Sequence, residues 1–442
     1  MGFKSSFSIK YRRWLVTIQT TKKSDGSWPT AIKCIDHEGT IFSVFSLISI
    51  ALHAQCDLIT PLKEEGFENL IQISEDGGLQ LHYENRRYRF EGVALKRVLE
   101  IIAATPCLSN SITIIIYNKG IPISELRTQK NAIDELISGE LSATTFNREA
   151  NFSFTTHKRP KEKVTNSSYL KSDVAVGART DYLLGNFDNP IRWTPMLLPS
   201  FQSTLARGTQ INTTYGVVLY DDLYFWEQSR FRYAFVSHNG RLPGGIFTRV
   251  SAGYFEQTQY GIEGHVTKFF FGDQLRLDLN LSITENKFLD KPPRRRAIDK
   301  NHFSYGLKAT YRYAPLTTDL SIHYGRYIFD DTGYTLLLQR QFNEVFIGFF
   351  MRETDRQIVG SFGKLFDRNY GFQFTVPIGT KKHLKPWYIR AKTEEQFYLD
   401  YNYTGGVDIG RRIHAPGTVI AELEEYYPST LQKALESLFK GS

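Results

Sequence analysis

The sequence is short of cysteine and has only one long apolar run, and these shortages exclude several classes of protein. The three cysteines of the 442-residue chain lie at positions 34, 56 and 107, without the paired close spacing that zinc and iron–sulfur sites require. Hydrophobic residues make up only 41% of the chain, and the mean hydropathy is -0.32. This composition is too polar for a membrane protein built of helices.

The single long apolar run covers residues 41–52 and is too short to cross a bilayer as a helix. Its length suits the apolar segment of a secretory signal, because Ala54 offers a cleavage position and basic residues precede the run. We therefore assign residues 1–54 to a leader or signal peptide region. The stretch before the run is longer than a signal's basic segment, which indicates a translation start placed too far upstream.

Two cysteines remain if this leader is removed, and three fates are open to them. Cys56 and Cys107 could form a disulfide in the oxidising periplasm, or they could stay two free buried thiols. Cys56 is also a candidate for lipidation, but residues 52–55 do not resemble a lipoprotein cleavage site. The sequence alone leaves these alternatives open.

The formal net charge of +8 does not predict nucleic-acid binding. Residues 1–54 carry part of the basic surplus, and the remainder is small and spread over the rest of the chain. Such a balance still allows a local basic lining that would attract an anionic polymer.

Residues 55–147 have the mixed pattern of a small soluble α/β domain. Helices are predicted at 58–65, 93–104 and 129–137, and strands at 70–73, 79–83 and 112–117. Domains of this kind serve for docking or ring formation beside a membrane pore, and nothing in this one indicates catalysis. Residues 148–170 are polar and charged, and we interpret them as a linker, or as a first polar strand followed by a loop.

Beyond residue 170 apolar and polar residues alternate with a period of two. In the clearest segment, residues 275–283, Leu and Ile alternate with Arg, Asp, Asn and Ser, so that one face can meet hydrocarbon and the other water. Similar patterns occur at 246–255, 260–266, 305–313, 320–324, 345–351 and 370–376. Connections between them vary from the short 314–315 to the long, charged 287–301.

This period predicts a mainly β protein whose residues 171–415 form an antiparallel transmembrane β-barrel of about 12–14 strands. A large soluble β-sandwich would also alternate, but the frequent Tyr and Phe at strand ends are typical of the aromatic girdles of a barrel. The small α/β domain precedes the barrel and would be periplasmic. Residues 416–442 are predicted to be a helical tail, with an amphipathic helix at 429–439 acting as a periplasmic appendage.

The polar faces of the predicted strands supply the candidate binding residues. Inside a barrel they would line the lumen with both signs of charge and could hydrogen-bond a hydrated sugar chain without holding it tightly. Alternatively they pair with one another and fill the barrel, and the sequence does not separate the two possibilities. The candidates are Arg249, Glu263, His265, Arg276, Asp278, Lys308 and Arg312.

No enzyme and no cofactor are predicted. His265 and His323 lie on the polar faces of ordinary amphipathic strands, and such positions favour hydrated lumen residues over catalytic bases. The sequence contains no Gly-x-Ser-x-Gly elbow, no phosphate-binding loop and no His-Glu-x-x-His motif. An outer-membrane hydrolase is retained as a third hypothesis, which labelling by a serine-reactive probe would test.

Several stretches, in their order along the chain, resemble one known family, the YjbH family of exopolysaccharide biosynthesis and export proteins, which are outer-membrane barrels. They are EGFENL at 65–70, YENRRYR at 83–89, SAGYFE at 251–256, GRY at 325–327, DTG at 331–333 and GFQFTVP at 371–377. This resemblance implies a protein of the Gram-negative outer membrane, in contact with outer-membrane lipid, an exported polysaccharide and periplasmic polysaccharide-export proteins. Family members typically have a further strand-rich region before the α/β domain. No such region is predicted here, which would fit a truncated, split or compact variant.

Two functions follow as hypotheses. The first is a channel or guide for an exported polysaccharide. The second is a structural or assembly protein with a filled lumen that recruits periplasmic export factors without conducting.

Overall fold

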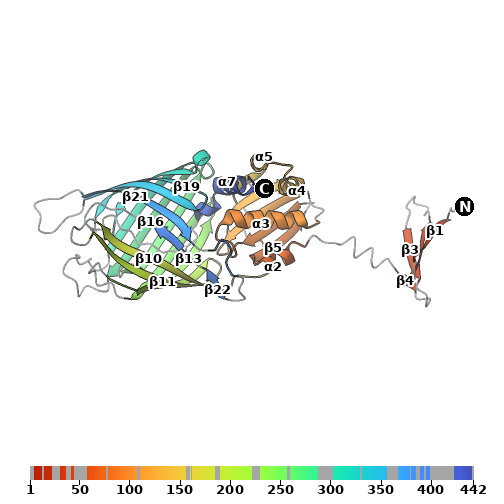
Figure 1. The fold of residues 1–442 in the computed structure, drawn as a ribbon, viewed down its shortest axis with the longest axis horizontal. Helices are drawn as coiled ribbons and strands as arrows, with labels where there is room; N and C mark the ends of the chain where they lie inside the picture. Colours follow the sequence, from red (N-terminus) through yellow and green to blue (C-terminus); the bar gives the residue numbers. More distant parts are fainter. Residues whose placement is uncertain are drawn as a thin grey trace, which may run out of the picture. The chain divides into compact units, whose positions relative to one another are not determined.

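The computed structural model divides the chain into two compact units, Met1–Asp57 and Leu58–Ser442. Figure 1 shows the fold, coloured along the sequence. The described residues are 4–11, 14–21, 30–35, 41–43, 57–75, 78–106, 110–155, 160, 162–184, 190–221, 229–255, 259–286, 302–328, 331–355, 367–378, 380–384, 389–392, 395–398 and 423–440. Cys56 and Cys107, the proposed disulfide partners, lie outside them.

The first unit contains a small sheet that the sequence analysis did not predict. Its four strands pair in chain order and antiparallel: β1 (Lys4–Tyr11), β2 (Trp14–Thr21), β3 (Thr30–Ile35) and β4 (Ile41–Ser43). A strand signal is present in β1, where Phe7, Ile9 and Tyr11 alternate with Ser8 and Lys10. Of the apolar run at 41–52, only 41–43 is described. The assignment of 1–54 to a leader stays a prediction.

The second unit begins with an α/β module, residues 58–155. Its five-stranded sheet has the order β5-β6-β7-β8-β9, in which β6 and β7 are parallel and joined through α3. The predicted helices and strands are confirmed here, whereas α5 and β9 were not predicted. The elements are α2 (Ile59–Glu65), β5 (Glu68–Glu75), β6 (Gly78–Glu84), α3 (Glu91–Ala104), β7 (Ser111–Asn118), β8 (Ile121–Gln129), α4 (Lys130–Ser138), α5 (Ala143–Glu149) and β9 (Asn151–Phe154).

The segment predicted to be a linker, 148–170, is in part an integral piece of this module. β9 adds the fifth strand to its sheet, because Phe152 and Phe154 pair with the β8 backbone. Farther along, Thr165 and Leu70 exchange backbone hydrogen bonds of 2.8 and 2.9 Å. The second of the two interpretations, a polar strand followed by a loop, therefore describes the segment better.

A large sheet follows, and it confirms the two-residue period. Twelve consecutive strands, β10 to β21, pair antiparallel, and two short strands, β22 and β23, add to its edges. The strands are β10 (Ser172–Leu184), β11 (Ile191–Ala206), β12 (Thr209–Val218), β13 (Arg230–Leu242), β14 (Ile246–Phe255), β15 (Gln259–Phe270), β16 (Leu275–Asn286), β17 (His302–Tyr313), β18 (Thr318–Arg326), β19 (Thr332–Phe342), β20 (Val345–Thr354), β21 (Asp367–Ile378), β22 (Ile389–Lys392) and β23 (Glu395–Tyr398).

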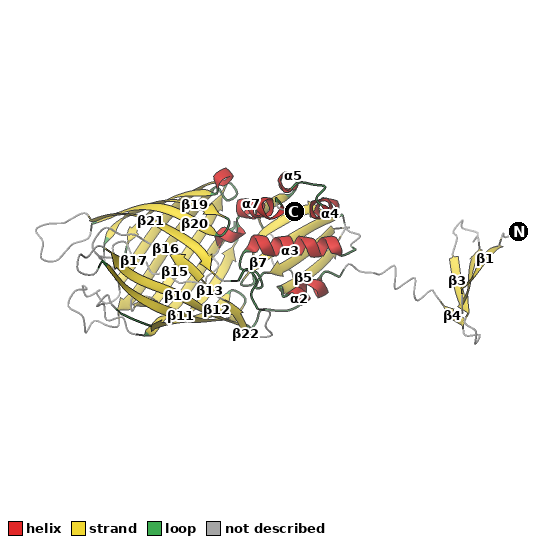
Figure 2. Ribbon diagram, in the orientation of Figure 1, coloured by secondary structure: helices red, strands yellow, loops and turns green. Residues whose placement is uncertain are grey.

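The sheet curls, as Figures 1 and 2 show, but its hydrogen bonding does not close it into a barrel. β10 and β23 lie in contact, so the two edges approach each other. The edge of β10 is taken by β22 in parallel orientation, and β23 pairs antiparallel with β21. Among the described strands, no ladder joins β22 to β23.

The two faces of the sheet have opposite character. Along β16, the outward side chains Leu277, Leu279 and Ile283 are 36%, 40% and 57% exposed. Their neighbours Arg276 and Asp278 are only 8% and 4% exposed. A water-soluble sheet protein buries its apolar face and exposes its polar one, so this arrangement is inverted.

Connections at the two ends of the sheet also differ. At one end the strands are joined by two to four residues, as at 207–208, 271–274 and 343–344. At the other end the connections span three to fifteen residues, and the longest is 287–301. The α/β module contacts the short-turn end, where Gly208 N donates to Lys119 O over 2.9 Å and Arg89 pairs with Glu344 at 2.5 Å.

The C-terminal segment, residues 423–440, comprises η3 (Leu423–Tyr426) and α7 (Pro428–Phe439). The predicted helix at 429–439 is confirmed. Rather than standing free, α7 packs on α3, α5 and β9 of the module. Gly92 of α3 faces Ala434, and a Cβ atom at position 92 would overlap the Ala434 methyl group, so only glycine allows this close approach. No described helix is both long and apolar enough to cross a bilayer.

Candidate functional site on the polar face of the large sheet

The seven candidate residues lie together on one face of four neighbouring strands. Strand pairing accounts for this, because side chains two residues apart share a face and paired positions lie side by side. Five of the seven are buried, and His265 and Lys308 are partly exposed. The positions are Arg249 on β14, Glu263 and His265 on β15, Arg276 and Asp278 on β16, and Lys308 and Arg312 on β17.

Arg249 and Glu263 form a buried ion pair. The Arg249 Nη2 to Glu263 Oε1 distance is 2.6 Å, and the two side chains are 4% and 1% exposed. Asn280 Nδ2 donates a second hydrogen bond of 2.7 Å to the same carboxylate oxygen. The pair links β14, β15 and β16 across the polar face, and each charge offsets the cost of burying the other.

Asp278 is the centre of a second cluster. Its carboxylate accepts hydrogen bonds of 2.7 Å from Thr267 Oγ1 and from Arg276 Nε, and His265 Nε2 lies 3.5 Å away. Lys308 occupies the position opposite Asp278 on β17. The cluster therefore surrounds one carboxylate with three basic side chains.

Arg276 connects this cluster to the C-terminal segment. Its Nη1 atom donates a 2.6 Å hydrogen bond to the Tyr427 hydroxyl and lies 3.8 Å from Glu424. The Tyr427 ring packs against Phe154 of the module and Phe269 of the large sheet, with ring centroids 6.1 and 5.4 Å apart. Tyr427 thus joins three parts of the second unit.

Arg312 is the most highly connected side chain of the face and is only 1% exposed. Its Nη1 atom lies 3.0 and 3.2 Å from the two carboxylate oxygens of Asp319. It donates to Gln341 Oε1 at 3.1 Å, to Ser429 Oγ at 3.0 Å and to Thr430 Oγ1 at 2.8 Å. The guanidinium also lies over the Tyr427 ring, 4.9 Å from its centroid.

The start of α7 is fixed by a further contact. Ser429 N, an amide of the first helical turn, donates a 2.9 Å hydrogen bond to Asp273 Oδ2 in the turn between β15 and β16. A carboxylate at this place satisfies an amide that has no partner within the helix and interacts favourably with the helix dipole. Together with Arg276 and Arg312, Asp273 anchors α7 to the large sheet.

These contacts correct one expectation and bear on another. The predicted appendage at 429–439 is instead part of the site, and Tyr427, Ser429 and Thr430 were not among the candidate residues. Amphipathicity showed that α7 has a face to bury, but not which surface covers it. The charges of the face are paired with one another and with the C-terminal segment, as the filled-lumen alternative requires.

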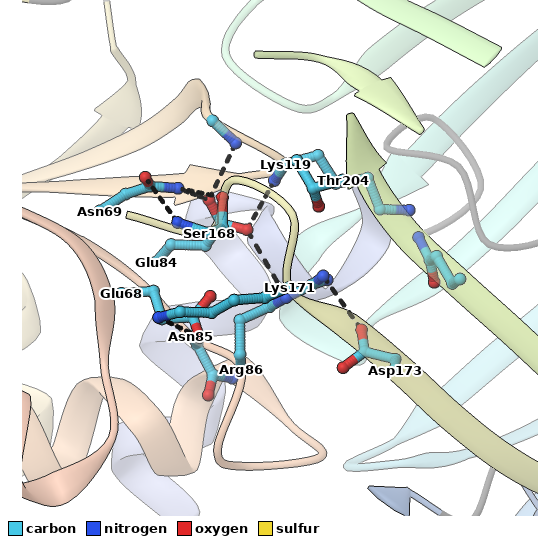
Figure 3. A network of polar contacts seen from close by, with 12 residues as sticks. Glu68, Asn69, Glu84, Asn85, Arg86, Lys119, Ser168, Lys171, Asp173 and Thr204 are labelled. Atoms are coloured by element: carbon cyan, nitrogen blue, oxygen red, sulfur yellow. Dashed lines mark hydrogen bonds and ion pairs between the residues drawn. The ribbon is translucent and has the colours of Figure 1, made fainter. Parts of the chain in front are cut away.

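A second polar network joins the module to the first strand of the large sheet (Figure 3). The buried Glu84 carboxylate accepts hydrogen bonds from Lys119 N at 3.0 Å, Gly120 N at 2.8 Å and Asn69 Nδ2 at 2.5 Å. Arg86 lies 3.8 Å from Glu84 and 3.0 Å from Asp173 of β10. Lys171, just before β10, pairs with Glu68 at 3.2 Å.

The neighbouring residues 85–89 dock onto residues 381–383, which follow β21. Arg89 N donates to Lys381 O, and His383 N donates to Arg87 O over 2.8 Å. Lys382 Nζ pairs with Glu65 at 2.5 Å. Burial opposes ionisation of Glu65, but hydrogen bonds from Lys382, Tyr88 and Arg97 prevail and lower its pKa to about 2. The module is therefore tied to the large sheet near both its first and its last long strand.

Comparison with known proteins gives one finding. The sequence model of the YjbH family, described as "Exopolysaccharide biosynthesis protein YbjH", matches residues 17–230 and 222–384. The match covers more than half of the chain and includes the four strands of the polar face and most of the α/β module's contacts with the large sheet. No curated protein matches the sequence.

Proposed function

Because the chain belongs to the YjbH family of exopolysaccharide biosynthesis proteins, we propose that it is a β-barrel of the Gram-negative outer membrane that takes part in polysaccharide export. The observation that carries this proposal is the inverted large sheet. Its outward rows of Leu, Ile, Phe and Tyr are exposed, and its charged rows are buried. A bilayer is the environment in which such an exterior is stable, and closing the sheet into a cylinder satisfies the strand edges there.

The difference between the two ends of the sheet supports an orientation. Outer-membrane barrels have short periplasmic turns and longer extracellular loops. The α/β module contacts the short-turn end, so it would lie in the periplasm. There it is placed to meet periplasmic export proteins before the polymer reaches the membrane.

Two roles in export are consistent with this placement, and the polar face favours one of them. Arg249, Arg276 and Arg312 are buried and bound to carboxylates, and α7 is anchored to the face by Arg312 and Asp273. A filled interior supports a structural or assembly role, in which the module recruits export factors. The role of a channel or guide would require α7 to leave, exposing Arg276, Arg312 and Asp278 to a passing polymer. The proposal includes no catalytic step.

Two experiments test the proposal in sequence. Cell fractionation combined with heat-modifiable gel migration tests location and barrel closure; recovery of folded protein from a fraction prepared without detergent would refute the proposal. Deletion of the gene in a polysaccharide-secreting host should reduce the secreted polymer, and unchanged secretion would exclude a role in export.

Planar-bilayer recordings then distinguish the two roles. Purified wild-type protein with a filled interior should show no stable open events. A variant lacking residues 423–442 should open if the interior can become a channel. Steady openings of the wild-type protein would favour the channel role from the outset.

A further inference from the structure

Arg340 lies on the outward face of the large sheet, at the short-turn end, and takes no part in the polar face or in the contacts with the α/β module described above. Arg340 is two residues from the end of β19 and lies on the same face as Leu338 and Phe342, which are 49% and 46% exposed. Across the strands it is paired with Thr318 and Ile347. Among the described residues, no carboxylate forms an ion pair with Arg340.

The Arg340 guanidinium lies over the Phe342 ring, 4.6 Å from its centroid. Lys268 of β15 repeats this geometry at the same end, with its ammonium 5.0 Å from the centroid of the Phe270 ring. Each cation precedes its phenylalanine by two residues and the next turn by three. Basic side chains with apolar stems and aromatic neighbours are typical of the interface between hydrocarbon and headgroups.

Arg340 differs from Lys268 because it lines a cleft, whereas Lys268 does not. The cleft has a volume of about 280 Å³ and lies between the β17–β18 turn, the end of β19 and one side of α7. Its lining includes Arg340, Phe342, Leu316, Lys433, Glu436 and Lys440. Lys433 pairs with Glu436 at 3.0 Å, so Arg340 and Lys440 supply the surplus positive charge.

From these features we infer that the cleft binds the headgroup of an anionic phospholipid from the module-side leaflet of the membrane. Arg340 and Lys440 contact the phosphate, and the acyl chains lie along the exposed Phe342, Leu338 and Ile347. The cleft opens at the boundary between the apolar outward face of the sheet and the charged side of α7, so a ligand with one charged end and one apolar end matches both sides. A basic pocket beside a membrane-exposed surface is a known way to recognise anionic headgroups.

This inference rests on the proposed membrane location, and it is tested on the full-length protein purified in nonionic detergent. Dioctanoyl phosphatidylglycerol and dioctanoyl phosphatidylcholine are titrated by calorimetry against wild-type protein, Arg340→Gln, Arg340→Gln/Lys440→Gln and Lys268→Gln. The Lys268→Gln variant is the matched control, because it removes the same cation-on-phenylalanine geometry from the same end of the sheet, away from the cleft. Heat-modifiable migration checks that each variant is folded.

We expect wild-type protein and Lys268→Gln to prefer phosphatidylglycerol. Each cation removed from the cleft should weaken its binding about fivefold. Equal binding by the wild-type protein and the double variant would overturn the inference. So would Arg340-dependent binding of an acidic oligosaccharide such as hexagalacturonate without any preference for phosphatidylglycerol, because the cleft would then serve the polymer. If the proposed membrane location is wrong, the fractionation experiment yields folded protein without detergent. That result is different from a failure of the lipid site, which only the titrations reveal.

Discussion

Replacing Arg312 by Ala should release α7 from the large sheet. The substitution removes the guanidinium that binds Asp319, Gln341, Ser429 and Thr430, and it leaves the Asp319 carboxylate buried without its cation. Breaking a buried ion pair from one side costs about 3–5 kcal/mol. We expect a loss of this size in the free energy of local opening of residues 423–440, since these contacts are made on the same side chain and do not add independently.

Hydrogen exchange of the α7 amides, followed by mass spectrometry in detergent, measures this free energy directly. Three further variants make the reasoning refutable. Arg312→Ala/Asp319→Leu should recover much of the loss, because it removes the unpaired carboxylate, whereas Arg312→Lys should recover only part, because an ammonium lacks the planar fork. Arg368→Ala, which breaks the exposed pair with Glu353, should leave α7 unchanged. Unchanged exchange of α7 in Arg312→Ala would show that the polar face does not hold this helix.

Three further predictions concern other parts of the second unit. Burial raises the pKa of Glu91 to about 8. The Glu91 contribution to the stability of the module should therefore fall by roughly 3 to 6 kcal/mol as pH rises from about 4.5 to 8, and stay constant above pH 8. Denaturant titrations at several pH values measure this dependence, and Glu91→Gln should abolish it. Leu279→Arg, on the outward face, should make folding into lipid vesicles less favourable by about 2–4 kcal/mol, and the matched Leu316→Arg, in a short turn, by about 0–1 kcal/mol, because a charge costs less near the membrane interface. Urea titration measures both, and equal costs would contradict a membrane-spanning position for Leu279. Gly92→Leu should displace α7, because the new side chain overlaps Ala434, and it should raise protease cleavage near residue 427. Gly139→Ala is the control: its Cβ would have open space but a left-handed φ, so it should lower stability without that cleavage.

The faces of the large sheet could be predicted from the sequence because a strand with one apolar side has only one register that keeps that side together. The alternation from Leu275 to Ile283 predicted that the apolar side chains of this strand share one face, and Leu277, Leu279, Leu281 and Ile283 are exposed together on that face. The ion pair between Arg312 and Asp319 was not predicted. The sequence analysis placed the connection at 314–315, whereas the turn between β17 and β18 spans 314–317, and only this longer turn brings Arg312 opposite Asp319.

Other features depend on contacts that local pattern does not encode. Arg276 and Tyr427 are 151 residues apart, and no spacing rule connects them. The amphipathic α7 predicts a buried face, but the covering surfaces come from α3, β9 and two arginines of the large sheet. Strands β1 to β4 were missed because the apolar run at 41–52 led to a leader interpretation for the whole region, despite the alternation in Phe7, Ile9 and Tyr11.

The separate attachments of module and helix give the two proposed roles different mechanical requirements. The module is held at Asp173, Gly208, Glu344 and residues 381–383, none of which belongs to the C-terminal segment. α7 is held by Arg312 and Asp273 on one side and by α3, α5 and β9 on the other. Removing α7 therefore leaves the module docked, so a channel role would be gated by the helix without any change in the recruitment of periplasmic partners. An assembly role has the opposite dependence: breaking the Glu84 and Arg86 network should impair export, whereas loss of α7 alone should matter only through the stability of α3, α5 and β9, the module elements on which it packs.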